Sequence, residues 1–324
     1  MNKSLALFLD KATLSPGDLN FSELEKVADW QWFDNANTSD IKHSLNNAEI
    51  IVSNKVVVDA EVIDSCQQLK LICVAATGVN NVDVDYARQI GISVCNVRAY
   101  ATSSVVQHVF SLILSLNGKL GVYQESVASG RWSSSEFFCQ FEAPVNELEG
   151  KTIGIIGYGE LGKAVAKVAR CFGMNVLVAN SYKVANVSDG ASTEKRVSVA
   201  ELLSTADIVS LHCPLTETNH NMIATAEFSL MKSDAILINT ARGGLVDEAA
   251  LLTALKEKQI GAVGLDVLEE EPPSINHPLI NYDADNLIIT PHIAWASKQA
   301  RQRLIVELEK NIRAYQQGLS RNII

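Results

Sequence analysis

The sequence lacks the signatures of several protein classes. None of its six cysteines forms a C-x-x-C pair, and most stand in apolar runs such as Leu71–Val74, where a thiol behaves as a small buried hydrophobe. This argues against a zinc site or a disulfide framework, so no metal is expected. No stretch approaches the ~20 apolar residues of a membrane span, and the run Leu5–Leu9 is too short for a signal peptide. We therefore expect a cytoplasmic protein with no membrane partner.

The sequence also has fewer basic than acidic residues. The 324 residues include 27 Lys and Arg against 37 Asp and Glu, which gives a net charge of −10. Because an acidic surface repels phosphate backbones, nucleic acid is not an expected partner. No repeat of 20–50 residues is visible, which argues against a solenoid. A hydrophobic content of 47% at this length is sufficient for two globular domains.

What the sequence does contain is an alternation of apolar runs with helical patterns. Continuous apolar runs are typical of strands buried on both faces of a parallel sheet, and the alternation predicts an α/β fold of doubly wound sheets. The expected strands are residues 5–9, 50–52, 71–75 and 92–94, and then 152–156, 175–179, 208–212, 236–239, 261–266 and 287–290.

Two helical segments bear on the domain organisation. Residues 103–118 form a helix whose apolar positions cover most of its circumference, so we expect it to be buried on nearly all sides, linking two domains or lying in a dimer interface. The tail from about 297 to 318 forms one amphipathic helix. If the first domain needs this helix to complete its fold, the chain returns to that domain, which is then discontinuous in sequence.

A dinucleotide-binding fingerprint lies between residues 151 and 162. The pattern G-x-G-x-x-G follows a strand directly and opens an alanine-rich helix. Gly157 permits the tight turn, Gly159 lets the backbone approach a pyrophosphate, and Gly162 lets helix and strand pack closely. Glu160 and Leu161 open the helix, whose N-terminus faces the phosphates. The alternative is a tight turn that binds no ligand.

The end of the second strand bears on which dinucleotide is bound. The fingerprint expects an acidic residue there to bond the adenosine ribose, but the sequence has Asn180, followed by Ser181 and Lys183. An asparagine does not repel a 2′-phosphate, and Ser181 and Lys183 are able to bind one. The sequence therefore slightly favours NADP over NAD. The alternative, in which Asn180 bonds the ribose of NAD and Lys183 is solvated, stays open.

Three polar residues follow later strands, at the sheet edge where such folds bind ligands. Arg242 lies between small residues in N-T-A-R-G-G, Glu271 precedes a proline that restricts its backbone, and His292 follows Thr290-Pro291. Each has an ordinary structural explanation: an arginine capping a turn, a solvated acidic loop, a histidine at a strand end. Their occurrence together at the strand ends of one nucleotide-binding sheet favours a catalytic role.

The chemistry of 2-keto acid reduction explains this choice of residues. It needs a hydride, a proton for the developing alkoxide and a clamp on the carboxylate. Arg242 is suited to grip the carboxylate and polarise the carbonyl. A carboxylate at Glu271 would keep His292 protonated as the general acid.

At these residues the sequence resembles the D-isomer-specific 2-hydroxyacid dehydrogenase family. The resemblance covers nearly the whole chain and rests on the Gly157 fingerprint, L-H-C-P-L-T at 211–216, N-T-A-R-G-G at 239–244, the block 264–272 and T-P-H-I-A at 290–294. Phe8-Leu9-Asp10 and the run 75–83 most resemble the bacterial glycerate dehydrogenase or hydroxypyruvate reductase branch.

The family resemblance implies the following roles. Arg242, Glu271 and His292 correspond to the catalytic residues, and backbone amides at Ala76, Thr77 and Gly78 correspond to the loop that receives the substrate carboxylate. Asp266 corresponds to the aspartate that contacts the nicotinamide carboxamide. The cofactor cleft is lined by His212, Pro214, Thr240 and Ala241.

The resemblance also implies an organisation and a reaction. A flavodoxin-like substrate domain spans 1–98 plus 293–324, and a Rossmann NAD(P)-binding domain spans 99–292. The chain is expected to form a homodimer and to interconvert a small 2-keto acid, hydroxypyruvate or glyoxylate, and its D-2-hydroxy acid. Gln107 stands where many members of the family have Glu, and we assign no chemical consequence to this difference. The alternative from another class is an NAD(H)-sensing binding protein or corepressor without turnover.

Overall fold

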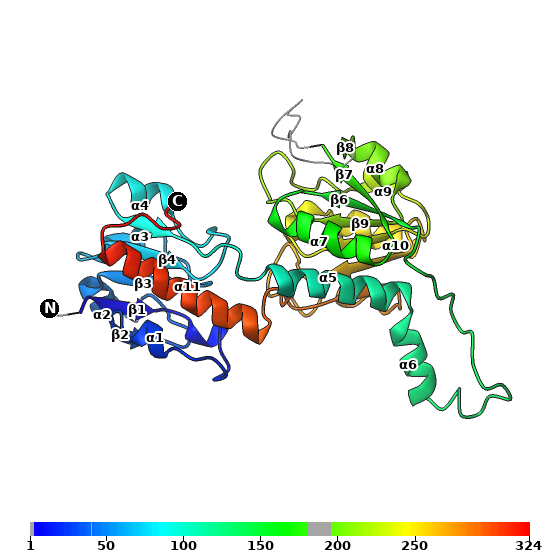
Figure 1. Cartoon of the computed structure of the whole chain (residues 1–324), viewed down its shortest axis with the longest axis horizontal. Helices are drawn as coiled ribbons and strands as arrows, with labels where there is room; N and C mark the ends of the chain where they lie inside the picture. Colours follow the sequence, from blue (N-terminus) through cyan, green and yellow to red (C-terminus); the bar gives the residue numbers. More distant parts are fainter. Residues whose placement is uncertain (1–2, 40, 181–195) are drawn as a thin grey trace. The chain divides into compact units, whose positions relative to one another are not determined.

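In the computed structural model of the chain, which describes residues 3–39, 41–180 and 196–324, the polypeptide divides into two compact units (Figure 1). Unit 1 contains the residues up to Ala101 together with Trp295–Ile324, and unit 2 contains Thr102–Ala294. The chain thus passes between the units after Ala101 and after Ala294, whereas the sequence places these boundaries after residues 98 and 292.

Unit 1 is built on a five-stranded parallel sheet of order β2-β1-β3-β4-β5. This is the order 2-1-3-4-5 of flavodoxin-like folds. Its central strands β3 and β4 are buried at every residue, as the apolar runs predict. The strands are β1 Leu5–Phe8, β2 Asp29–Trp32, β3 Ile50–Ser53, β4 Leu71–Val74 and β5 Ser93–Cys95. The helices are α1 Ser22–Glu25, α2 Lys42–Asn47, α3 Ala60–Asp64, α4 Val84–Gln89 and α11 Lys298–Gln316.

The C-terminal helix α11 completes unit 1, as the sequence suggests. Ser297 caps its N-terminus by accepting a hydrogen bond from the Ala300 amide. One face carries the buried Leu304, Leu308 and Ile312, and in Figure 1 the helix lies along the sheet of this unit. The discontinuity of unit 1 therefore follows from the apolar face of α11, which unit 1 buries.

Unit 2 is built on a seven-stranded parallel sheet of order β12-β11-β10-β9-β6-β7-β8. Counted from β6, this contains the 3-2-1-4-5-6 order of a Rossmann sheet, which confirms the predicted fold class. The strands are β6 Thr152–Ile156, β7 Asn175–Ala179, β8 Arg196–Val197, β9 Ile208–Leu211, β10 Ile236–Asn239, β11 Ala262–Leu265 and β12 Leu287–Ile289. The helices are α5 Thr102–Asn117, α6 Leu120–Ala128, α7 Glu160–Cys171, α8 Val199–Thr205, α9 Thr225–Leu230 and α10 Glu248–Lys256.

Helix α5 differs in one respect from its prediction. It packs against β10, β11 and α7, but a stripe that includes Gln107, Ser111 and Leu114 is exposed. The helix therefore has one accessible face and is not buried on nearly all sides. Among the described residues no single helix is long and apolar enough to cross a membrane, and α5 and α6 meet that criterion only as a pair bent by 61°.

Candidate active site

The turn between β6 and α7 is closely packed on one side and open on the other. Gly157 has φ +97°, and a Cβ there would lie 2.4 Å from the carbonyl carbon of His212. A Cβ on Gly162 would lie 2.1 Å from the carbonyl oxygen of Gly157. A Cβ on Gly159, in contrast, would meet no atom within 4 Å. The open position is the one at which the fingerprint expects a pyrophosphate.

Residues on either side of this turn add polar groups. Glu160 opens α7 and accepts a hydrogen bond from the Thr102 hydroxyl, while Leu161 is half-buried. At the end of β10 the buried Thr240 hydroxyl has no hydrogen-bond partner within residues 3–39, 41–180 and 196–324. A buried polar group without a partner is costly unless a ligand satisfies it. Thr240 Oγ1 therefore fits a dinucleotide whose polar groups reach the end of β10.

His212 and Pro214 follow β9, beside Thr240 and Ala241 on the neighbouring strand end. His212 Nε2 lies 2.9 Å from Ser210 Oγ, and burial lowers the pKa of His212 to about 4. The imidazole is therefore neutral at pH 7. Pro214 is exposed, and the Ala241 amide donates to Asn239 Oδ1 at 3.0 Å.

At the end of β7, Asn180 is exposed and its amide donates to the Val197 carbonyl of β8. Ser181 and Lys183, the other two residues expected here, lie outside the described residues. A basic group that the sequence analysis missed is nearby: Arg196 Nη1 donates to the Ala179 carbonyl at 3.3 Å, and its guanidinium carbon lies 5.8 Å from the Tyr158 ring centroid. The sequence does not indicate a role for Arg196, because its position near the end of β7 depends on the pairing of β7 with β8.

Arg242 lies on the loop after β10. The Asn239 side chain holds this loop, since its Nδ2 donates to the Arg242 carbonyl at 2.8 Å. Gly243 packs against the loop that follows β11: a Cβ there would lie 1.9 Å from the carbonyl carbon of Leu268. The loops carrying Arg242 and Glu271 are thus in direct backbone contact.

Glu271 and His292 come together as the sequence predicts. His292 Nδ1 lies 2.5 Å from Glu271 Oε2, and Glu271 Oε1 accepts a hydrogen bond from the Leu268 amide at 2.9 Å. Both side chains are about one-third exposed, at 28% for His292 and 34% for Glu271. His292 has φ +53°, a left-handed conformation that is uncommon for a residue with a Cβ. The pair is therefore accessible, hydrogen-bonded and held in a defined backbone geometry.

The carboxylate of Asp266 holds the turn that carries His292. Its Oδ1 accepts hydrogen bonds from the Thr290 hydroxyl at 2.5 Å and the Ile293 amide at 2.9 Å, and its Oδ2 accepts one from the Ala294 amide at 2.8 Å. Burial alone would raise the pKa of Asp266, but hydrogen bonds from His108, Thr290 and the two amides lower it below its ordinary value. Asp266 is thus an ionised, fully buried carboxylate.

His108 is a second residue that the sequence analysis missed. Its Nε2 lies 2.9 Å from Thr290 Oγ1 and 3.4 Å from Asp266 Oδ1. A histidine in an apolar helix usually indicates core packing. The available signal was its spacing: Ser104 and His108 are polar residues one turn apart on the face of α5 that is otherwise apolar.

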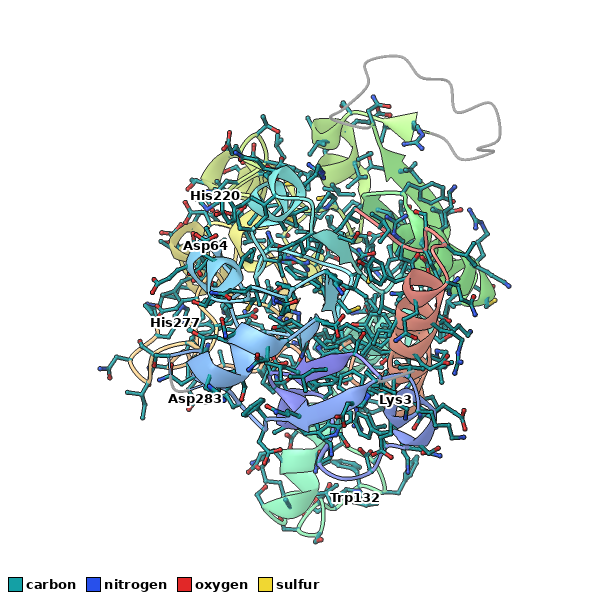
Figure 2. The ribbon with its side chains drawn as sticks, turned by 90° about the vertical axis from the view of Figure 1, so that its left-hand side faces the viewer. Lys3, Asp64, Trp132, His220, His277 and Asp283 are labelled. Carbon is teal, nitrogen blue, oxygen red and sulfur yellow. The ribbon has the colours of Figure 1, made fainter. Side chains whose placement is uncertain are left out.

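The acidic run 269–271 is more ordered than a solvated loop. Glu248 accepts a hydrogen bond from the Glu269 amide through Oε1 and contacts His277 Nε2 at 3.0 Å through Oε2. Glu269 Oε1 contacts His220 Nε2 at 3.0 Å. Figure 2 labels both histidines. Among the described residues no three His, Cys, Asp or Glu side chains are grouped to hold a metal ion.

In unit 1, the loop after β4 is shaped by two side-chain bonds. Thr77 Oγ1 donates to the Val97 carbonyl, and Asn96 Nδ2 donates to the Thr77 carbonyl, both at 2.8 Å. The amides of Ala76, Thr77 and Gly78 donate to no acceptor within the part of the chain that the structure describes. Three successive unpaired amides are suited to bind an anion.

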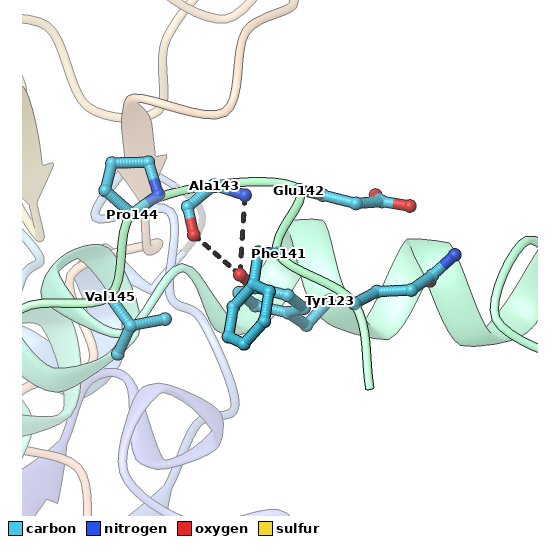
Figure 3. A pocket seen from close by; sticks show the side chains of 7 residues that line it. Tyr123, Phe141, Glu142, Ala143, Pro144 and Val145 are labelled. Atoms are coloured by element: carbon cyan, nitrogen blue, oxygen red, sulfur yellow. Dashed lines mark hydrogen bonds between the residues drawn. The ribbon is translucent and has the colours of Figure 1, made fainter. Parts of the chain in front are cut away.

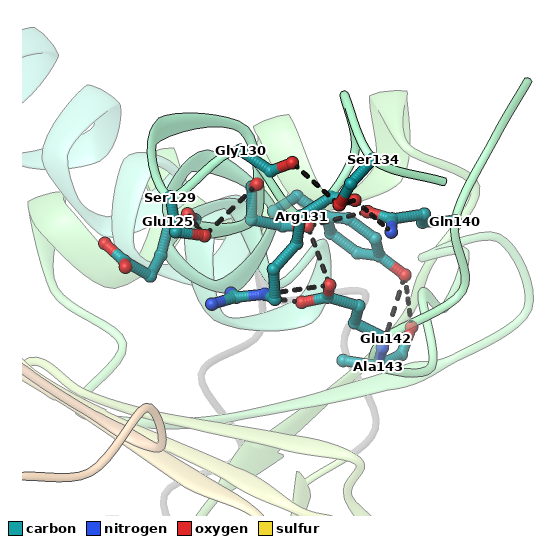
Figure 4. Close-up of polar contacts among 10 residues, drawn as sticks. Glu125, Ser129, Gly130, Arg131, Ser134, Gln140, Glu142 and Ala143 are labelled. Carbon is teal, nitrogen blue, oxygen red and sulfur yellow. Dashed lines mark hydrogen bonds and ion pairs between the residues drawn. The ribbon is translucent and has the colours of Figure 1, made fainter. Parts of the chain in front are cut away.

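Helix α6 and the segment that follows it extend away from the sheet of unit 2 (Figure 1). The segment folds back on α6 through polar bonds: Arg131 bonds both oxygens of Glu142, and the Tyr123 hydroxyl donates to the Ala143 carbonyl at 2.6 Å (Figure 4). A cavity of about 440 Å³ lies here (Figure 3), lined by Tyr123, Gln140, Phe141, Glu142, Ala143, Pro144 and Val145. We call residues 118–149 the arm. The arm also carries Trp132 (Figure 2).

Comparison with known proteins identifies relatives of the whole chain. The family described as "D-isomer specific 2-hydroxyacid dehydrogenase, NAD binding domain" matches residues 110–294. A glycerate dehydrogenase of Methylorubrum extorquens is 42% identical over 98% of both chains, and a hydroxypyruvate reductase of Blautia hydrogenotrophica is 36% identical over 98% of both. Among solved structures, an acyclic imino acid reductase in complex with NADPH and D-Arg superposes with a TM-score of 0.86, at 30% identity over 99% of both chains.

Proposed function

Because the chain belongs to the D-isomer specific 2-hydroxyacid dehydrogenase family, we propose that it reduces hydroxypyruvate or glyoxylate to the D-2-hydroxy acid with NAD(P)H, and catalyses the reverse oxidation. The observation that carries this proposal is the 2.5 Å contact between His292 and Glu271 on a nucleotide-binding sheet. An imidazole paired with a carboxylate is the usual arrangement of a general acid that must be protonated near neutral pH.

His292 is the proton donor in this proposal. When bound, the reduced dinucleotide supplies a hydride to C2 of the keto acid, and the carbonyl oxygen then needs one proton. His292 gives that proton from Nε2, since Nδ1 faces Glu271. In the oxidation direction the neutral imidazole takes the hydroxyl proton back. Glu271 stays hydrogen-bonded to Nδ1 in both directions and orients the imidazole.

Each unit, taken by itself, offers a group suited to bind a carboxylate. In unit 2 the Arg242 guanidinium offers parallel N–H donors and attracts electron density from the neighbouring carbonyl, which favours hydride addition. In unit 1 the amides of Ala76, Thr77 and Gly78 have no protein acceptor among the described residues, which suits them to a carboxylate. The two groups explain how a protein with a net charge of −10 takes an anionic substrate.

The residues of the β6–α7 turn fit a dinucleotide. The open position at Gly159 accommodates the pyrophosphate, the first turn of α7 with Glu160 and Leu161 directs its amides towards it, and the Thr240 hydroxyl, unpartnered among the described residues, gains a partner. His212, Pro214 and Ala241 line the same side. Asp266 contributes to the nicotinamide end, where its carboxylate holds the residues next to His292.

For the cofactor we propose a slight preference for NADPH over NADH. Asn180 places no negative charge at the end of β7, and Arg196 brings a positive charge to the adjacent carbonyl of Ala179. A 2′-phosphate is attracted by a guanidinium and is not repelled by an amide. Ser181 and Lys183 are further candidates for this contact.

We also propose that the chain forms a homodimer through the arm. The arm is polar inside and apolar outside: the Arg131–Glu142 pair lies against α6, whereas Phe137, Phe138 and Phe141 are 74%, 91% and 89% exposed. An ordered segment that exposes three phenylalanines is typical of a surface covered by a partner. Replacing Phe138 and Phe141 with serine should convert a dimer to a monomer in light scattering, and an unchanged mass would reject the arm as the interface.

The test of the proposed reaction is purified-protein oxidation of NADH and NADPH with hydroxypyruvate, glyoxylate, pyruvate and phosphohydroxypyruvate in parallel. We expect fastest turnover with hydroxypyruvate or glyoxylate, and formation of the D enantiomer from hydroxypyruvate. If either dinucleotide bound tightly but no keto acid turned over, the proposed reaction would be wrong and a dinucleotide sensor would be the better explanation.

A further inference from the structure

The turn that carries His292 is fixed by α5 as well as by Asp266. The Ser104 hydroxyl of α5 donates to the Ala294 carbonyl at 2.7 Å. One turn later on the same helix, His108 Nε2 lies 2.9 Å from Thr290 Oγ1. The segment from Thr290 to Ala294 is therefore bonded to α5 at both of its ends.

The positions of the protons follow from counting donors and acceptors. Asp266 is buried with its side chain 0% exposed, and its ionised carboxylate only accepts. The 2.5 Å contact therefore takes the single proton of the Thr290 hydroxyl. Thr290 Oγ1 has only lone pairs left to offer His108, so His108 Nε2 is the donor in the 2.9 Å contact. The same N–H points towards Asp266 Oδ1 at 3.4 Å.

We propose that His108 is a positioning residue of the reductase reaction: as an Nε2–H donor to Thr290 and Asp266, it fixes the buried carboxylate that holds the backbone on which His292 is presented. This inference rests on the proposed role of His292 as the proton donor. His108 itself does not touch the reacting atoms. It acts through Asp266, whose bonds to the Ile293 and Ala294 amides hold the residues next to His292.

The consequence for catalysis is geometric. Without the His108 donor, Thr290 Oγ1 keeps its bond to Asp266 at 2.5 Å but loses the N–H partner that fixes its position, and Asp266 Oδ1 loses the N–H at 3.4 Å. The bonds from the Ile293 amide to Oδ1 and from the Ala294 amide to Oδ2 would remain. The turn that carries His292 would stay at the same position, but its orientation would no longer be fixed. A misplaced general acid lowers kcat more than it lowers the affinity for substrate or dinucleotide.

The variants that test this are His108→Leu, which removes the donor, and His108→Gln, whose amide can restore a donor near the Nε2 position. Gln107→Ala, on the exposed face of the same helix, is the matched control. We expect His108→Leu to lower kcat for keto acid reduction by about 10- to 100-fold, with the NADPH dissociation constant and the Tm little changed. His108→Gln should recover most of kcat, and Thr290→Val should resemble His108→Leu.

A readout that does not depend on activity is the protonation of the ring. In ¹H–¹⁵N spectra of the ¹⁵N-histidine-labelled protein, the resonances lost in His108→Gln should show a protonated Nε2. An unprotonated Nε2, an equal loss of kcat in His108→Gln and His108→Leu, or an unchanged kcat in His108→Leu would each overturn the inference. His292→Gln separates the two claims: if that variant kept its rate the proposed function would fail, whereas its collapse beside an active His108→Leu would reject only the role of His108.

Discussion

At the β6–α7 turn the protein presents backbone, whereas at the ends of β10, β11 and β12 it presents side chains. The turn has no side chain at Gly157, Gly159 and Gly162, and its polar groups are amides. The opposite arrangement holds around His292, where Glu271, Asp266, Thr290 and His108 bond to one another or to the backbone between them.

The difference indicates what each region tolerates. A backbone site recognises an anion such as a pyrophosphate by its shape, through N–H groups and the positive end of the helix dipole, so any added carbon atom matters. A side-chain site depends on which atoms carry protons, so an isosteric change can abolish function without disturbing packing. Single substitutions can separate these two sensitivities.

Within the turn, Gly162→Ala and Gly159→Ala should behave differently. The Cβ at 162 would overlap the Gly157 carbonyl, so we expect a loss of about 1–3 kcal/mol in the free energy of unfolding, with dinucleotide affinity falling as well. At 159 the Cβ meets only open space, so unfolding should change by less than about 1 kcal/mol while the dinucleotide dissociation constant rises. Denaturant melts and fluorescence titrations measure both. Equal destabilisation by the two variants would contradict the open site at Gly159.

At the ends of β11 and β12, Asp266→Asn should lower the free energy of unfolding in a pH-dependent way. The pKa of Asp266 is lowered in the folded protein, so its ionised form contributes stability that is present above the unfolded value near 3.8 and is lost as the pH falls through the folded pKa. At pH 7 we expect the variant to be less stable by about 1–3 kcal/mol. The difference from the wild type should shrink below pH 4 in denaturant melts. A difference that stays constant with pH would show that the charge is not what holds the turn.

For Glu271→Gln, we expect the rate of reduction at pH 7 to fall by about tenfold, within the range of acid–base contributions. The amide keeps an acceptor for the Leu268 amide but weakens the contact that holds His292 Nδ1. The check is kcat for keto acid reduction in the variant and in the wild type. An unchanged kcat would remove Glu271 as the partner of His292.

The smallest expected effect is that of Asn180→Asp. A carboxylate at the end of β7 would repel a 2′-phosphate and accept bonds from a ribose, so kcat/KM should shift towards NADH by about 3- to 10-fold. Lys163→Ala, on the first turn of α7, removes a different positive charge near Tyr158. It tests whether such a loss alone also shifts kcat/KM towards NADH. If the cofactor ratio stayed constant in Asn180→Asp, this residue would not face the ribose.

The sequence predicts an element well when local interactions form it, and poorly when contacts between distant residues form it. Strands β6, β7 and β10 have the predicted bounds, because a continuous apolar run is a local property. Strand β2, in contrast, was not predicted. It is an edge strand of half-buried and exposed residues, and its Trp30 and Trp32 are ordered by stacking at 4.8 Å and by packing on Phe8.

The same limit applies to the site. Arg242, Glu271 and His292 stand in motifs, so the sequence indicates them and their strand ends, and the pairing of Glu271 with His292 follows. The contact of His108 with Asp266 joins helix α5 to the residue that follows β11, and no local pattern indicates that contact.

The most direct test is His292→Gln, with turnover and dinucleotide affinity measured on one preparation. We expect keto acid reduction to fall by about 10²- to 10⁴-fold, because the proposed proton donor is lost. The NADPH dissociation constant should stay within about threefold of the wild type, since the backbone turn at Gly157–Gly162 is untouched. A parallel loss of rate and affinity, or a rate that survives, would contradict the division of labour between the two regions.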